Sequence, residues 1–102
     1  MMTVITTTRL RHGAEQEWDA AIAERFASAH DRPGWVCGQL LTPLEAPDTR
    51  VIVGTWRDKD QWDAWHHDPA FVGQRARLKA LEAEPSTTTW YTVVADAPTT
   101  LG

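Results

Sequence analysis

The sequence contains a single cysteine, Cys37, among its 102 residues. No disulfide can therefore form within the chain, and no group of cysteines is available to bind a metal ion. Cys37 lies in an apolar stretch, and cysteines in such surroundings are most often buried and unreactive. We therefore expect an inert, buried thiol at this position.

The sequence also has no excess of basic residues and no long apolar runs. The formal net charge is −4, whereas nucleic acids and anionic membranes are bound by clustered Lys and Arg. No segment approaches the roughly 20 apolar residues that a membrane-spanning helix requires, and residues 1–10 lack the pattern of a signal peptide. We expect neither a nucleic acid nor a membrane as partner, and a cytoplasmic location.

The residue pattern predicts one α+β domain. Helices are indicated by apolar spacings of three and four residues over 14–29, by a possible N-cap at Asp58, and by Pro69 at the start of a segment ending near Leu81. Stretches rich in β-branched residues predict four strands, over residues 3–10, 36–42, 50–56 and 87–94. The order β-α-β-β-α-β, with its second helical part broken before Pro69, is typical of a ferredoxin-like antiparallel sheet with helices on one face. We assign residues 1–94 to this domain and residues 95–102 to a polar tail.

The strand over residues 50–56 is apolar on both faces. Val51 and Val53 lie on one face, and Ile52 and Trp56 lie on the other. Helices cover only one face of a ferredoxin-like sheet, so a second layer must cover the other. We therefore predict a homodimer in which the two sheets pack face to face.

The segment GTWRDKDQWDAWHHDPAF (residues 54–71) contains three of the six tryptophans, Trp56, Trp62 and Trp65. Any one of them alone is better explained as a core residue. Three together, beside Gly54 in a strand, favour a pocket for a flat aromatic ligand, because glycine leaves room for close approach. We expect Trp56 and at least one of the other two to line this pocket.

Several stretches resemble the antibiotic biosynthesis monooxygenase family. They are the strand VIVGTW, the run W-x2-W-H-x-DPAF, the helix RARLKALEAEP and the closing strand that contains Trp90 and Tyr91. The resemblance implies a dimeric α+β barrel with one pocket per subunit, between the sheet and the helices. The family includes cofactor-free monooxygenases that form quinones and monooxygenases that degrade haem.

The resemblance also implies site residues. In the members that oxidise polyketides, an Asn, a Trp, a Tyr and an Arg line the site, and these positions fall on Ile52, Trp56, Trp62 and Arg75. In the haem-degrading members, an Asn, a Trp and a haem-ligating His fall on Thr6, Trp65 and Arg75. The haem ligand is therefore replaced, which weakens that alternative. Phe71, at the end of the DPAF motif, completes the set of expected substrate-binding residues.

His66 and His67 could suggest a metal site. Neighbouring residues on a helix point about 100° apart and cannot chelate one ion, so we expect no metal and a mostly solvent-facing pair. His66 shares a helix face with Trp62, and we expect it to titrate near neutrality, so it could act as the base for a phenol. Arg75 is either a surface charge or a clamp for a phenolate or an oxygen-derived anion.

The leading hypothesis is a cofactor-independent monooxygenase that uses O2 to oxidise a polycyclic phenol, an anthrone or a hydroquinone. Trp56, Arg75 and His66 are the expected catalytic residues. Trp62, Trp65, Ile52, Thr6 and Phe71 are the expected substrate-binding residues. The alternatives are a non-catalytic dimer that binds a small aromatic metabolite and, less favoured, a haem-degrading enzyme.

Overall fold

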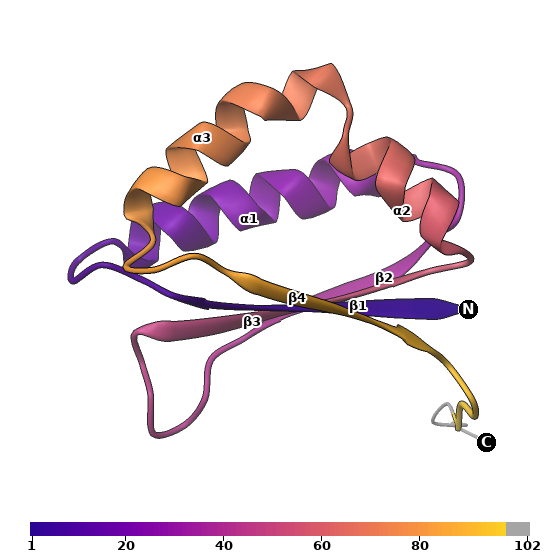
Figure 1. The fold of residues 1–102 in the computed structure, drawn as a ribbon, viewed down its shortest axis with the longest axis horizontal. Helices are drawn as coiled ribbons and strands as arrows, with labels where there is room; N and C mark the ends of the chain where they lie inside the picture. The colour runs from indigo at the N-terminus through magenta and orange to yellow at the C-terminus, as the bar shows by residue number, and fades with distance from the viewer. Residues whose placement is uncertain (98–102) are drawn as a thin grey trace.

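The computed structural model describes residues 1–97. Its elements, in chain order, are β1 (Met2–Arg9), α1 (Glu15–Ala29), β2 (Trp35–Leu41), β3 (Thr49–Trp56), α2 (Lys59–His66), the 3-10 turn η1 (Pro69–Phe71), α3 (Val72–Leu81) and β4 (Thr87–Thr92). The strands form one antiparallel sheet in the order β2-β3-β1-β4. All three helices lie on one face of that sheet (Figure 1). The predicted ferredoxin-like α+β fold is confirmed.

Strand pairing decides which side chains face the helices. Across β1 and β3, Val4 lies opposite Gly54, Thr6 opposite Ile52 and Met2 opposite Trp56. Directly paired residues share a face of the sheet, so these side chains all project toward the helical layer. Ile52, Gly54 and Trp56 therefore lie on one face, as their alternation in the sequence predicts.

The boundaries of two elements differ from the prediction. The segment after Pro69 begins as a 3-10 turn, in which the side chain of Asp68 accepts a hydrogen bond from the backbone N–H of Ala70 at 2.9 Å, and the α-helix starts only at Val72. Strand β4 ends at Thr92, two residues early, because Thr92 pairs with Met2 at the beginning of β1. The boundary between domain and tail stays a prediction, and part of the tail lies outside the residues that the structure describes.

Capping, a glycine turn and an ion pair fix the ends and positions of several elements. Asp58 caps α2 as predicted, accepting a hydrogen bond from the backbone N–H of Gln61 at 2.9 Å. Gly34 has a φ of +86°, a conformation that favours glycine, in the turn between α1 and β2. On β3, buried Arg50 binds Asp19 of α1 through two nitrogens at 2.8 and 3.1 Å, which joins the first helix to the sheet.

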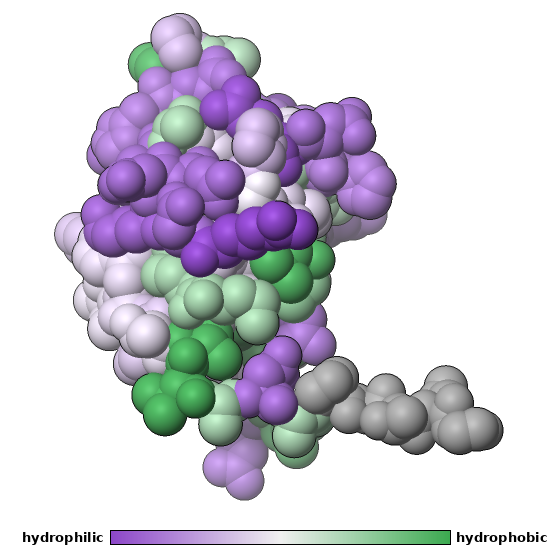
Figure 2. Space-filling model, turned by 90° about the vertical axis from the view of Figure 1, so that its right-hand side faces the viewer, coloured by the Kyte–Doolittle hydropathy of each residue, from purple (hydrophilic) through white to green (hydrophobic). Residues whose placement is uncertain are grey.

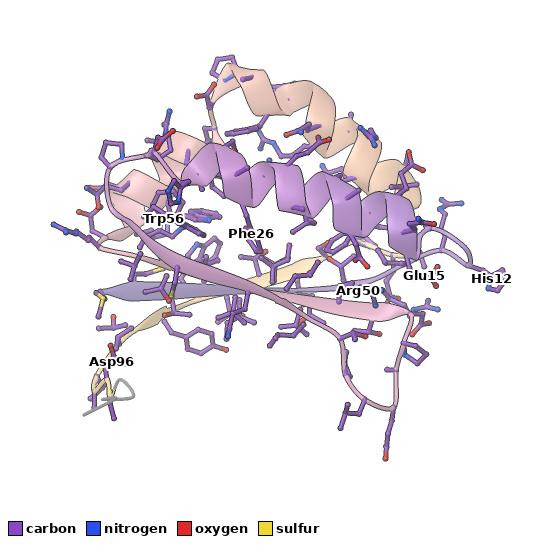
Figure 3. The ribbon with its side chains drawn as sticks, turned by 180° about the vertical axis from the view of Figure 1, so that it is seen from behind. His12, Glu15, Phe26, Arg50, Trp56 and Asp96 are labelled. Carbon is purple, nitrogen blue, oxygen red and sulfur yellow. The ribbon has the colours of Figure 1, made fainter. Side chains whose placement is uncertain are left out.

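The buried side chains fall into two clusters at opposite ends of the space between sheet and helices. One cluster contains Trp56, Trp62, Trp65 and Phe71, and the other contains Trp18, Ile22 and Leu78. In Figure 3, the labelled side chains of Trp56 and Phe26 lie between the helical layer and the sheet. This division of the core leaves room for a cavity.

The opposite face of the sheet is not covered by any helix (Figure 1). Cys37 pairs with Thr55 on this face and is exposed, so the expectation of a buried thiol is wrong for this chain by itself. The physical reason is a bulge between Trp35 and Cys37, which turns Cys37 to the uncovered side. Hydrophilic residues gather over the helical layer in Figure 2, whereas hydrophobic residues are grouped lower, where the sheet lies.

The described part of the chain contains no helix with the length and apolar composition needed to cross a membrane.

Candidate functional site

A cavity of about 770 Å³ lies between the sheet and the helices. This volume is within the usual range for small-molecule sites. Residues of all four strands form its floor, with β2 contributing Trp35, and α1, α2 and α3 form its roof. All six tryptophans line the cavity: Trp18, Trp35, Trp56, Trp62, Trp65 and Trp90.

Aromatic rings in contact form the wall at the α2 end. Trp56 is 1% exposed, and its ring centroid lies 5.2 Å from that of Trp35 and 5.4 Å from that of Trp65. Trp62 meets Trp90 edge to face, with 5.5 Å between centroids. Tilted and edge-to-face pairs are favourable aromatic geometries, so the rings hold one another in place. The cavity can therefore accept a planar ligand without rearranging this wall.

His66 is half-buried at the same end and lines the cavity. Its imidazole stacks on the ring of Trp62, with 4.5 Å between centroids and 14° between planes. Burial, followed by the positive charges of Arg75 and Arg25, lowers the pKa of His66 to about 4. Two expectations are therefore wrong: His66 is not solvent-facing, and it does not titrate near neutrality. His67 is exposed, as expected.

Two arginines line the cavity from neighbouring helices, Arg25 from α1 and Arg75 from α3. Arg25 is 6% exposed, and its guanidinium carbon lies 4.3 Å from the centroid of Trp65 and 4.7 Å from that of Phe71. Burial, followed by the charge of Arg75, lowers the pKa of Arg25 to about 10. Arg25 remains cationic at neutral pH, since even its lowered pKa is well above 7.

Hydroxyl groups and the carboxylates of Glu82 and Glu84 line the opposite end. Thr8 shares a hydrogen bond of 2.5 Å with Ser86, and the Ser86 hydroxyl donates to Glu82 Oε1 at 2.7 Å. Nearer the centre, Thr6 and Thr88 share a hydrogen bond of 3.0 Å between β1 and β4. The cavity thus has an aromatic end and a polar end.

The structure places seven of the eight predicted site residues on this one cavity. They are Thr6, Ile52, Trp56, Trp62, Trp65, His66 and Arg75. Phe71 is not among the lining residues; it is buried behind Trp65, with 5.4 Å between the ring centroids. The choice between core and pocket is not exclusive for the tryptophans, because Trp56, Trp62 and Trp65 are both nearly buried and cavity-lining.

Sequence reasoning missed Arg25, Trp35 and Trp90 as lining residues. Trp35 and Trp90 lie far from the tryptophan-rich segment in sequence and reach it through the sheet pairing. Arg25 could have been found: it lies seven residues after Trp18, two turns along the same face of α1, where an arginine is unexpected on an apolar stripe. Among residues 1–97, no three His, Cys, Asp or Glu side chains are grouped closely enough to hold a metal ion.

The chain is similar in sequence to a known protein family. The family model described as antibiotic biosynthesis monooxygenase matches residues 1–77. A heme oxygenase (mycobilin-producing) from Mycobacterium tuberculosis is 30% identical over 74 residues, which are 70% of this chain and 70% of that protein.

Solved structures share the fold over nearly the whole chain. SnoaB, a cofactor-independent oxygenase from Streptomyces nogalater, superposes with a TM-score of 0.83 at 24% identity, covering 96% of this chain and 97% of its own. A conserved protein from Methanosarcina mazei Go1 gives a TM-score of 0.82 at 14% identity, over 88% and 89% of the two chains. The chain therefore belongs to the antibiotic biosynthesis monooxygenase family, and a monooxygenase is the enzyme class that this membership supports.

Proposed function

We propose that this protein is a cofactor-independent monooxygenase that oxidises an electron-rich polycyclic phenol, of the anthrone or hydroquinone type, to a quinone with O2. The observation that supports this most is the cavity itself, which is lined by all six tryptophans and by two cationic arginines. Such walls suit a flat aromatic molecule that becomes negatively charged during the reaction. The relation to SnoaB, itself a cofactor-independent oxygenase, is consistent with the proposal.

The chemistry would come from the substrate. An anthrone that has lost a proton transfers one electron to O2, and the resulting radical and superoxide combine to a peroxide. Taking up a proton and losing water from this peroxide leaves the new carbonyl group, so both oxygen atoms are accounted for. The protein contributes alignment, exclusion of water and stabilisation of the negative charge.

Each site residue has a proposed part. Trp56, Trp62 and Trp65 hold the ring system, and Arg75 stabilises the anion. His66, neutral at pH 7, accepts a hydrogen bond from a substrate hydroxyl, while water takes the proton, because an imidazolium with a pKa near 4 is too acidic to hold it. Ile52 supplies an apolar contact on the floor of the cavity, and Thr6 a hydroxyl.

The enzyme is tested by O2 uptake with a panel of anthrones and hydroquinones. Turnover that yields the quinone in protein freed of metals supports the proposal. Saturable quenching of tryptophan fluorescence without any O2 uptake across the panel favours the alternative, a protein that binds an aromatic metabolite. Ile52 favours that alternative, because it offers no hydrogen bond where the resemblance implies an Asn.

The 30% identity to a heme oxygenase keeps haem degradation as a further candidate. Against it, Arg75 occupies the position where the resemblance implies a haem-ligating His. Of the described histidines, His66 alone lines the cavity, and its ring is stacked on Trp62. Titration with hemin, followed by addition of a reductant, tests whether the protein degrades haem. Stoichiometric binding with a shifted Soret band and ring opening would favour haem as the substrate over a phenol.

We also propose that the protein is a homodimer built through the uncovered sheet face. Val51, Val53 and Ile5 lie on that face and are only half-buried within one chain. The loop between β2 and β3 and the segment after β4 both extend beyond the sheet on this side (Figure 1). In that loop Leu44 is fully exposed, as expected of a residue that a second copy covers. The cytoplasm remains the predicted location.

A further inference from the structure

Unpaired hydrogen-bond donors are concentrated around the cavity. Among residues 1–97, four buried side-chain polar atoms have no hydrogen-bond partner: Trp18 Nε1, Arg25 Nη1, Gln61 Oε1 and Arg75 Nε. Three of the four are N–H donors on cavity-lining residues, and Gln61 lies outside the cavity. Buried donors without an acceptor are costly, so their gathering at one site suggests a ligand rich in acceptors.

Arg25 makes the clearest case because its buried Nη1 has no hydrogen-bond partner and its guanidinium makes no ion pair with the described residues. The five ion pairs in the described part of the chain involve Arg9, Arg32, Arg50, Lys59 and Arg77, and neither Arg25 nor Arg75. Glu24, the residue before Arg25, accepts a hydrogen bond from Gln74 of α3 instead. The rings of Trp65 and Phe71 under the guanidinium offer it only a partial substitute for an anion.

The remaining charges around the cavity do not supply that anion. Arg11 and Lys79 add two further cations to the lining. Of the two lining carboxylates, Glu84 pairs with Arg9 outside the cavity, and Glu82 accepts the Ser86 hydroxyl. His66, whose protonation is opposed by burial and by the charges of Arg75 and Arg25, is neutral at pH 7. A negative charge on the ligand is therefore the counter-ion that this site can receive.

We propose that Arg25, together with Arg75, binds a negatively charged oxygen group of the substrate, so that this cavity selects aromatic molecules that are anions when they bind. The assignment extends the proposed function by naming a substrate class and a specificity residue. It rests on that function only for the identity of the ring system, because anion selectivity can be measured by binding alone. The shared chemistry is an oxyanion on or beside an aromatic ring, either a carboxylate or a phenolate.

The experiment is calorimetric titration of the protein with matched naphthalene probes. The carboxylate 2-naphthoate is compared with its neutral amide, 2-naphthamide, and with the cation 2-naphthylmethylamine. We expect the carboxylate to bind about tenfold to a hundredfold more tightly than the amide, as charge-assisted hydrogen bonds allow. The source of the charge is separated with 4-nitro-1-naphthol, whose hydroxyl ionises well below the pKa of Arg25: if a phenolate suffices, its affinity rises as pH passes the pKa of the free naphthol, whereas 2-naphthoate affinity stays level over the same range.

Two variants assign the selectivity to Arg25. Arg25→Met keeps an apolar stem against Trp65 and Phe71 but removes the charge, so the preference for 2-naphthoate should fall to threefold or less while 2-naphthamide binding is retained. Arg25→Lys should keep part of the preference. Arg77→Gln is the matched control, because Arg77 is an exposed arginine on α3 that pairs with Glu17 and does not line the cavity.

The melting temperature gives a second readout that a structural role would not produce. Since Arg25 is a buried charge without an ion pair, Arg25→Met should melt at the same temperature as the wild type or higher. 2-Naphthoate should raise the melting temperature of the wild type and of Arg77→Gln more than that of Arg25→Met. Equal affinity of the wild-type protein for the three probes, or an Arg25→Met variant with unchanged preference, would overturn the inference. Anion-selective binding without O2 uptake would leave it standing and reject the proposed oxygenase instead.

Discussion

At the scale of single residues, the site combines aromatic rings with cations that have no anionic partner. Arg25 and Arg75 help to keep His66 neutral, since both charges oppose its protonation. A neutral imidazole and two guanidiniums in one cavity favour a ligand that brings its own negative charge. The residues that build the cavity therefore also decide the protonation state in which a substrate can be held.

The substitution Gly54→Ala tests whether a ligand needs the open space above Gly54 on the cavity floor. A Cβ at this position would lie 3.5 Å from Val4 Cγ1 and 3.7 Å from Trp56 Nε1, which are ordinary contact distances. Gly54→Ala should therefore fold with a free energy of unfolding equal to the wild type or up to about 1 kcal/mol higher. Its methyl group would project toward the ring of a bound ligand, so 2-naphthoate affinity should fall about tenfold or more, as overpacking does.

Thermal melts and calorimetry measure both effects. Gly73→Ala is the control, since a Cβ there meets nothing within 4 Å and Gly73 lies on the exposed side of α3. Wild-type affinity in Gly54→Ala would mean that the ligand does not reach the floor of the cavity beside Trp56.

The lowered pKa of His66 predicts a pH-dependent stability. The folded chain binds this proton with a pKa of about 4, and the unfolded chain with the usual value of 6.5. Between these values the unfolded state holds more protons, so the free energy of unfolding should decrease as pH falls from 6.5 to 4. His66→Gln should show a shallower decrease in urea unfolding curves measured across this range. His67→Gln, which changes the exposed neighbour, should keep the wild-type slope; identical slopes in all three proteins would show that His66 is not held neutral by the fold.

At the scale of elements, α2 carries the tryptophans of the cavity wall on a short helix. Trp62 and Trp65 lie three residues apart on its buried face, while Trp65 Nε1 also donates to Ser28 Oγ of α1 at 3.2 Å. A helix of 8 residues depends on its cap and its packing more than on propensity. The orientation of the aromatic wall therefore depends on the N-cap at Asp58.

Removing this cap should loosen the wall. Asp58→Ala deletes the acceptor for Gln61 N–H and should lower the free energy of unfolding by about 1 kcal/mol. We expect weaker binding of neutral and anionic naphthalene probes alike, because the change moves ring positions rather than charge. Asp60→Ala is the control, since it removes a first-turn charge without a capping bond and should cost less. Equal losses in the two variants would attribute the effect to the helix dipole.

At the scale of the whole molecule, the sheet separates a cavity-forming face from an uncovered one. The uncovered face carries apolar side chains at Ile5, Val51 and Val53, with Tyr91 at its β4 side. In a chain of 102 residues the core is small, and burial of a second face would add to its stability. This is the physical basis of the proposed dimer.

A charge on the uncovered face should separate the two copies. Val53→Asp would place an unpaired carboxylate in the interface and weaken dimerisation by several kcal/mol, roughly a hundredfold or more. Sedimentation velocity at micromolar concentration should show a dimer for the wild type and a monomer for Val53→Asp. Ala20→Asp, on the exposed side of α1, should remain a dimer. A wild-type monomer at this concentration would refute the proposed assembly.

Much of the fold was predictable because the relevant signals are local. Alternation in VIVGTW indicates a strand with two distinct faces, and Asp58, Gly34 and Pro69 mark ends of elements by their own backbone chemistry. The errors are long-range ones: β4 ends at Thr92 because its partner Met2 is the first residue of β1, and Cys37 is exposed because of a bulge in the pairing with β3. A residue does not carry information about the length of its partner strand.

By itself, the sequence determined the order of the elements, the sharing of one sheet face by Ile52, Gly54 and Trp56, and the presence of an aromatic-rich segment, because each depends on spacing within a few residues. Only the tertiary structure decided that Trp18, Trp35 and Trp90 join this segment around one cavity. It also decided the chemistry of the site, since the pKa of His66 and the isolation of Arg25 follow from burial and from charges on separate helices. The electrostatic environment of a group depends on its neighbours in space, and these neighbours are far apart in the sequence.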